Sequence, residues 1–138
     1  MTCCSPPTGT PNVLLLAGAI ESAAHARDFV RTYVCETSPT ASGTHLDDVT
    51  LVTSELVTNS YRYGTEPGDM IRVVLHIDDA RTRVEVYDPV RRRPRHRPES
   101  TDRTRGHGLF ILDAVCGGMW GCEDQPFGKC VWAEIPCR

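Results

Sequence analysis

The amino-acid sequence predicts an α+β fold, a two-layer sandwich with helices on one face of a mixed, mostly antiparallel sheet. Its 138 residues are close to the commonest domain size, so one hydrophobic core is expected. Segments with apolar residues at helical spacing are interspersed with segments rich in β-branched residues. The predicted order is strand, helix, helix, strand, strand, long loop, helix, strand, strand, which favours separate helix and sheet layers.

The chain is expected to contain a flexible tail, residues 1–12, and a single domain, residues 13–138. The tail is rich in Pro, Thr, Ser and Gly. The apolar run at 13–20 is predicted to be a buried or edge strand. Ser22 is placed to cap a helix. That helix carries five apolar or aromatic residues at helical spacing: Ala26, Phe29, Val30, Tyr33 and Val34.

A second helix of about twenty residues is predicted after the breaker segment 37–43. Thr44 can cap its start, and Asp47 and Asp48 are expected in its first turn, where the helix dipole favours acids. Gly64 is expected to stop it.

Two β-rich segments, 71–78 and 82–89, are predicted to form an antiparallel hairpin. In the second of them, Val84 and Val86 should face the core. The residues that alternate with these valines should face outward: Arg83, Glu85 and Tyr87.

The segment 89–105 contains three prolines and no apolar residue beyond Val90, so it is expected to be a long exposed loop. A short helix is predicted at 106–116. Two further strands are predicted at 119–124 and 128–136.

Composition excludes several classes of protein. The formal net charge is -3, and residues 91–105, with seven arginines against Glu99 and Asp102, carry +5 and leave -8 on the rest of the chain, so we do not expect a nucleic-acid partner. The apolar run at 13–20 is too short to span a membrane, and no Lys or Arg precedes it as in a secretion signal.

Seven cysteines without a C-x-x-C pair are best interpreted as free thiols in a reducing, cytoplasmic setting. A metal site formed by Cys116, Cys122 and His107 is the less favoured alternative.

The stretch SELVTNSYRYG, residues 54–64, places two polar groups at one edge of the apolar stripe of the second helix. Successive residues are rotated by about 100° around a helix, so Glu55 and Asn59 lie one turn apart on the same face. Taken alone, such a pair is more often made of ordinary boundary residues than of functional ones.

Later features give the pair a context. Asp88 ends a strand, a basic loop follows, Gly106 and Gly108 enter a helix, and a Gly128–Lys129 turn precedes the last strand. Together with Glu55 and Asn59, this set resembles the Bergerat-fold ATPases, the family of gyrase and the histidine kinases. It most resembles the small anti-sigma-factor serine kinases and related stand-alone bacterial ATP-binding regulators, over residues 13 to 136.

The resemblance implies that ATP and Mg²⁺ are bound. It implies that Asn59 coordinates the Mg²⁺, that Glu55 polarises the attacking nucleophile, and that Asp88 accepts a hydrogen bond from the adenine amino group. Residues 89–105 correspond to the family's ATP lid. The remaining implied ATP-binding residues are Arg105, Gly106, His107, Gly108 and Leu109.

Two departures from the family pattern leave two functions open. The run DPVRR stands where the family has D-x-G-x-G, and Cys130 stands where a Thr usually reaches adenine. The first function is an anti-sigma factor that sequesters a sigma factor and phosphorylates a serine of an antagonist protein. The second is a nucleotide-sensing binding module without phosphotransfer. The resemblance also suggests a homodimer through the N-terminal strand and helix.

Overall fold

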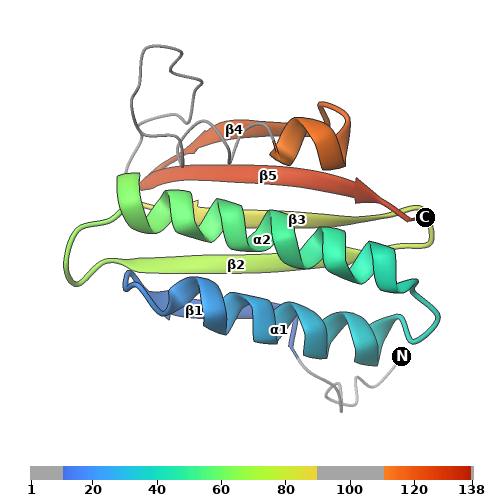
Figure 1. Cartoon of the computed structure of the whole chain (residues 1–138). Coiled ribbons are helices and arrows are strands. Elements are labelled where there is room, and N and C mark those ends of the chain that lie inside the picture. The colour runs from blue at the N-terminus through green and yellow to red at the C-terminus, as the bar shows by residue number, and fades with distance from the viewer. Residues whose placement is uncertain (1–10, 90–110, 138) are drawn as a thin grey trace, which may run out of the picture.

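The computed structural model describes residues 11–89 and 111–137 of the chain. Figure 1 shows two long helices packed against one sheet, with a further helical segment at 111–116. The labelled elements, in chain order, are β1 (Val13–Ala17), α1 (Ser22–Thr37), α2 (Gly43–Tyr63), β2 (Met70–Ile77), β3 (Arg81–Asp88), β4 (Trp120–Gln125) and β5 (Gly128–Pro136).

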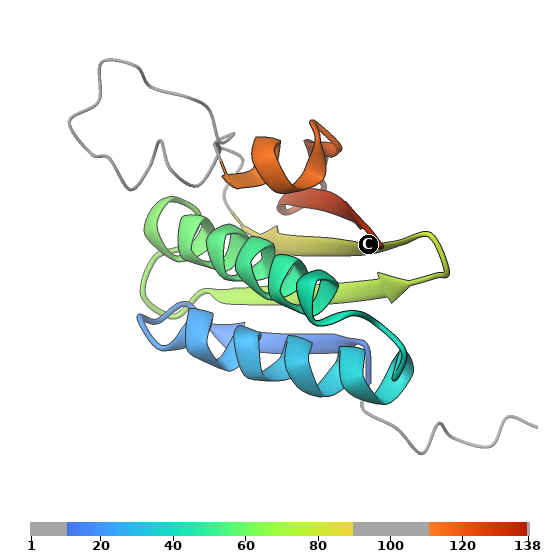
Figure 2. The same ribbon diagram turned by 45° about the vertical axis from the view of Figure 1, so that its right-hand side comes forward.

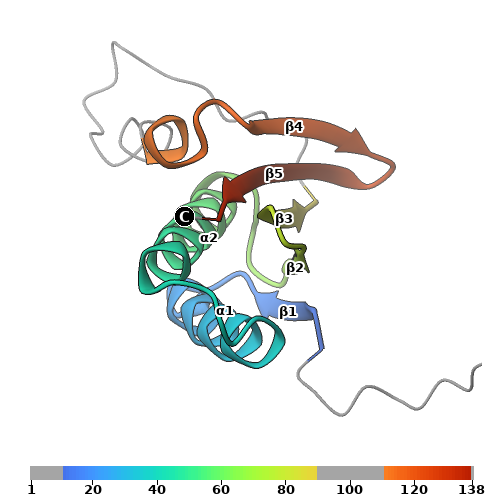
Figure 3. The ribbon, with the colours of Figure 1, turned by 90° about the vertical axis from the view of Figure 1, so that its right-hand side faces the viewer.

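The sheet has the strand order β1-β2-β3-β5-β4, and each of its four strand pairs is antiparallel. The predicted two-layer α+β class is therefore confirmed, and the sheet is antiparallel throughout the described strands rather than mixed. Helix α1 contacts β1 and β2, while α2 contacts β2, β3 and β5. Figure 3 shows both helices on the same face of the sheet.

The core lies between these two layers. Along β3, buried residues alternate with partly exposed ones, so Val84 and Val86 face the helices as predicted. Figure 2 shows α1 and α2 side by side over the sheet. The largest fully buried side chains are Ile71, Leu75, Leu112, Ile135, Val30, Val34, Val49, Val52, Val57, Val73 and Val84.

Helix α1 begins differently from the prediction. Its N-cap residue is Glu21, without a capping hydrogen bond from the side chain. The hydroxyl of Ser22 donates a hydrogen bond to the backbone oxygen of Ala17 and accepts one from the backbone N–H of Ala19 at 3.2 Å. Ser22 therefore connects the start of the helix to the end of β1.

Helix α2 is capped by Ser42, not Thr44, because the Ser42 hydroxyl accepts a hydrogen bond from the backbone N–H of His45 at 3.0 Å. This earlier start leaves no acidic residue in the first turn, so the prediction for Asp47 and Asp48 was wrong. Gly64 is confirmed as the C-cap residue, and its N–H donates to the backbone oxygen of Ser60 at 2.8 Å.

Strand β1 lies at one edge of the sheet, which confirms the edge-strand alternative predicted for the apolar run at 13–20. The side chain of Leu15 at its centre is 63% exposed, whereas Leu16 next to it is buried. Among the helices of the described residues, none has the length and apolar character needed to cross a membrane.

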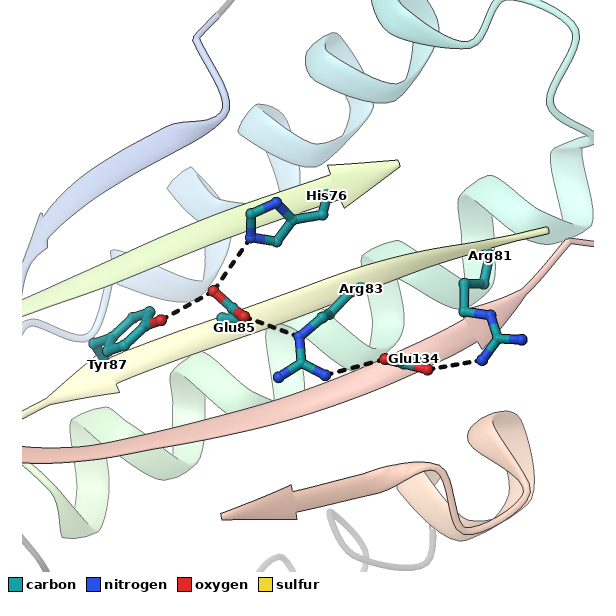
Figure 4. Close-up of polar contacts among 6 residues, drawn as sticks. All are labelled: His76, Arg81, Arg83, Glu85, Tyr87 and Glu134. Atoms are coloured by element: carbon teal, nitrogen blue, oxygen red, sulfur yellow. Dashed lines mark hydrogen bonds and ion pairs between the residues drawn. The ribbon is translucent and has the colours of Figure 1, made fainter. Parts of the chain in front are cut away.

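The face of the sheet opposite the helices carries a polar network, which we call the outer network (Figure 4). Its members are His76, Arg81, Arg83, Glu85, Tyr87 and Glu134. Glu134 accepts hydrogen bonds from Arg81 at 2.8 Å and from Arg83 at 3.0 Å. These two bonds link the adjacent strands β3 and β5 through their outward side chains, and Arg83 also donates to Glu85 on its own strand at 2.8 Å.

Candidate functional site

The helix that carries SELVTNSYRYG is α2, and it places Glu55 and Asn59 on a half-buried strip between the core and the surface. The neighbouring Leu56 and Val57 are buried against the sheet. The predicted position of both polar residues at the helix edge is confirmed. Their roles toward a nucleotide stay predictions.

Asp88 ends β3, and its carboxylate is fully buried. The ammonium group of Lys129 lies 2.8 Å from Oδ1 and 3.1 Å from Oδ2 of this carboxylate. The hydroxyl of Ser60, on α2, donates a further hydrogen bond to Oδ2 at 2.7 Å. A buried charge is tolerated only when it is paired and hydrogen-bonded, and Asp88 meets both conditions.

Two glycines allow the backbone to approach Asp88 closely. A Cβ atom at Gly64 would overlap Oδ2 of Asp88 and would lie 2.9 Å from Oδ1. At Gly128, where φ is +151°, a Cβ atom would overlap the backbone oxygen of Asp88 and would lie 2.7 Å from Cα of Pro89. The helix stop and the Gly–Lys turn seen in the sequence therefore have a common cause, because both leave room for Asp88.

The contacts of Asp88 connect β3 to the helix that carries Asn59. Ser60 directly follows Asn59 in α2, so the residue predicted to hold Mg²⁺ and the residue predicted to recognise adenine belong to one end of the domain. Lys129 reaches the same point from β5, where it pairs in register with Asp88. We call Ser60, Asp88 and Lys129 the carboxylate cluster.

Sequence reasoning missed two members of this cluster. Ser60 is an ordinary serine near a helix end, and Lys129 was noted only as part of a turn. One signal was present: the chain contains 14 arginines and a single lysine, Lys129. That lone lysine lies one residue into an apolar strand, where a charged group needs a partner.

Cys130, which stands where the family usually has a Thr, lies on the opposite face of the sheet from the Asp88 side chain. It pairs in register with Tyr87, whereas Lys129 pairs with Asp88. Successive strand residues point to opposite faces, so Lys129 lies on the helix face with Asp88 and Cys130 on the other. Burial raises the pKa of the Cys130 thiol to about 11, so the thiol is protonated near neutral pH.

An open depression of about 490 Å³ lies beside the cluster. Its lining includes Asp88 and Lys129 together with Arg72 and Tyr87, which point away from the helices. The Arg72 guanidinium lies 4.1 Å from the centre of the Tyr87 ring, in a cation–π contact. This depression therefore approaches Asp88 from the side of the sheet that does not carry Glu55 and Asn59.

Five predicted ATP-binding residues lie outside the described residues: Arg105, Gly106, His107, Gly108 and Leu109. The arginine-rich segment 91–105 does so too. The described part of the predicted helix, 111–116, is helical, and Leu112 buries its side chain in the core.

The five cysteines in the described ranges are free thiols. Within 11–89 and 111–137, no group of three or more His, Cys, Asp or Glu side chains is arranged to hold a metal ion. The alternative metal site of Cys116, Cys122 and His107 is not tested by this, because His107 lies outside those ranges.

The fold and the carboxylate cluster define a class of protein, a two-layer α+β domain with a buried acidic residue at the end of an inner strand. Residues 16–133 match the family model of the histidine kinase-like ATPase domain. The chain therefore belongs to the histidine kinase-like ATPase family, and the predicted resemblance to the Bergerat-fold ATPases is confirmed.

One similar solved structure contains the RsbU and RsbW domains of a Mycobacterium tuberculosis protein. The two chains superpose with a TM-score of 0.62 at 19% sequence identity, over 91% of this chain and 33% of that one. This chain thus spans about a third of the length of that protein, and the likeness shows a shared fold. No curated protein sequence matches the chain.

Proposed function

We propose that this protein binds Mg-ATP at the end of the domain where α2, β3 and β5 meet. The observation that carries the proposal is the hydrogen bond from Ser60 to Asp88 at 2.7 Å. It joins the helix of Asn59 to the strand of Asp88, so the amide proposed to hold a phosphate-bound metal and the carboxylate proposed to bind adenine belong to the same end of the domain. Membership of the ATPase family supports this choice of ligand.

The residues present fit the two groups. Mg²⁺ prefers hard oxygen ligands and keeps several waters, so one amide oxygen from Asn59 is sufficient beside phosphate oxygens. Gly64 and Gly128 leave the close space around Asp88 that side chains would otherwise fill. The five family positions between Arg105 and Leu109 are proposed to bind the phosphates.

The proposed activity is transfer of the terminal phosphate to a serine of an antagonist protein, in the manner of an anti-sigma factor that also sequesters a sigma factor. In this proposal Glu55, one turn from Asn59, accepts the proton of the serine hydroxyl as the phosphate is transferred. Bound ATP supplies the phosphoryl group. We also propose that the protein is cytoplasmic. We further propose that it forms a homodimer through β1 and α1, and light scattering would test this oligomeric state.

Site variants test the metal and base roles separately. Asn59→Ala should abolish Mg-dependent ATP binding in calorimetry, while Asn59→Asp, which keeps an oxygen ligand, should retain part of it. Unchanged binding in Asn59→Ala would remove the metal assignment.

Glu55→Ala should bind Mg-ATP normally but lose transfer of labelled phosphate to a co-purified partner by about 10²- to 10⁴-fold. The matched control is Asp47→Ala, which removes an exposed acid from the same helix. Undiminished transfer by Glu55→Ala would exclude the base role.

A second candidate function is a nucleotide-sensing binding module without phosphotransfer. It is favoured by the carboxylate cluster, because Lys129 already contacts both oxygens of Asp88, and by Pro89, which stiffens the following backbone. Partner capture in the presence and absence of Mg-ATP separates the two. Phosphoserine on the captured partner indicates the kinase, and nucleotide-dependent capture without phosphoserine indicates the sensor.

A further inference from the structure

The single lysine of this chain, Lys129, is buried, although a buried charge is costly unless it is paired. Lys129 is 4% exposed, while all 14 other Lys or Arg positions are arginine. Arginine is the usual choice for a buried ion pair, because its planar guanidinium binds a carboxylate with two parallel hydrogen bonds. The one lysine thus stands at a position where an arginine would be expected.

The two side chains differ in how firmly they hold a carboxylate. A guanidinium fixes it in a two-point geometry, whereas an ammonium is a compact charge whose three donors rotate freely. Lys129 contacts Oδ1 of Asp88 at 2.8 Å and Oδ2 at 3.1 Å, so its ammonium lies across the carboxylate edge. An ammonium in this position can slide toward one oxygen and leave the other to a new donor.

The surroundings restrict where a new donor could come from. The backbone of Gly64 closes on the carboxylate from the end of α2, that of Gly128 lies against the backbone of Asp88, and the Ser60 hydroxyl occupies a position on Oδ2. Lys129 therefore holds acceptor positions that an incoming amino group would need. A purely structural ion pair would account for the contacts, but it would not account for a lysine in a chain that otherwise uses arginine.

We propose that Lys129 is a specificity-determining residue: it acts as an internal ligand of Asp88 and yields part of the carboxylate when the amino group of an adenine base binds. This inference rests on the proposed nucleotide-binding function. Lys129 then lowers the affinity for nucleotides that use Asp88, and hypoxanthine, which has a carbonyl at the position of the adenine amino group, presents an acceptor there instead of the displacing donor. Nucleotide affinity thereby depends on whether the base carries an amino group that can take the place of Lys129 on Asp88.

Lys129→Met tests the competition. Methionine keeps an unbranched chain of similar length without donors, so the Asp88 carboxylate is left short of hydrogen bonds that an adenine amino group can supply. In calorimetry the Kd for Mg-ADP should fall about tenfold, as one hydrogen bond to a charged group implies. The Kd for Mg-IDP, whose base has a carbonyl in place of the amino group, should not fall.

The matched control is Arg83→Met, which removes a basic side chain from the outer network on the same sheet. It should change neither Kd. Weaker ADP binding by Lys129→Met, or an equal change for ADP and IDP, would overturn the proposal. Circular dichroism establishes beforehand that each variant is folded.

The wild-type chain offers a second test that does not depend on a variant. Labelling with ¹⁵N-lysine gives one side-chain signal, because Lys129 is the only lysine. Saturation with Mg-ADP should shift this signal, and Mg-IDP should shift it less.

Binding itself is followed independently by equilibrium dialysis. Bound ADP with an unmoved Lys129 signal would refute the role of Lys129 while leaving the proposed function intact. Absence of ADP binding would refute both.

Discussion

The two faces of the sheet use the same kinds of residue in opposite ways. On the helix face, Asp88 and Lys129 form one fully buried pair. On the open face, the carboxylates of the outer network share two partly exposed arginines, Arg81 and Arg83, and Arg81 is 45% exposed. Water screens the second arrangement but not the first. Ion pairs with similar N–O distances on the two faces should therefore differ greatly in how much free energy of unfolding is lost when they are removed.

The buried pair gives the largest expected effect. Asp88→Asn leaves the Lys129 charge buried without its counter-charge, so the free energy of unfolding should fall by about 3–5 kcal/mol in urea denaturation. The double variant Asp88→Asn, Lys129→Met removes both charges and should recover most of this loss. If Asp88→Asn lowers the free energy of unfolding by less than about 1 kcal/mol, water screens the ion pair on the helix face as it does those on the open face.

Crowding around Asp88 gives the next effect. Gly64→Ala places a methyl group against the carboxylate and should destabilise the protein by about 1–3 kcal/mol, as overpacking does. Gly43→Ala is the control, because a methyl group at Gly43, the first residue of α2, meets no atom within 4 Å. Equal stability of the two variants in thermal denaturation would mean that the close approach at Gly64 is readily relaxed.

The outer network gives a smaller effect. Glu85 accepts hydrogen bonds from Arg83 at 2.8 Å and from Tyr87 at 3.0 Å, and these contacts are only partly buried. Glu85→Gln should therefore cost no more than about 1 kcal/mol of unfolding free energy at pH 7. A cost as large as that of Asp88→Asn would abolish the contrast between the faces.

The acid dependence of the outer network is the subtlest test. Partial burial on its own raises the pKa of Glu85, but hydrogen bonds from Arg83, Tyr87 and His76 outweigh it, and the pKa is lower than its ordinary 4.5. The stabilisation from Glu85 is therefore complete above pH 4.5 and is lost as the pH falls through the lowered value. The difference between wild type and Glu85→Gln, measured by urea denaturation, should stay constant from pH 7 to about pH 5 and shrink as the pH falls further to 3.

Much of this arrangement was predictable from local patterns, and the remainder depended on strand register. Periodicity located the helices, the hairpin and the inward valines, Val84 and Val86, because those signals are local. The helix cap was misplaced because Ser42 and Thr44 are both suitable capping residues and spacing does not choose between them.

The partner of Asp88 was not predictable in the same way. A shift of one residue in register exchanges the faces of Lys129 and Cys130, and only the observed pairing of β3 with β5 decides which of them meets Asp88. The roles of Glu55 and Asn59 depend on a ligand, so they stay predictions.

The pairing of β3 with β5 also bears on how the chain can evolve. Asp88 and Lys129 are 41 residues apart in sequence, yet they form one contact. The entropy cost of closing such a loop rises slowly, by only about 0.6 kcal/mol for each doubling of its length. A change in the length of the predicted loop 89–105 should therefore cost little closure entropy, whereas Leu112 and β4, which lie between the same two residues, are held by the core and by the sheet.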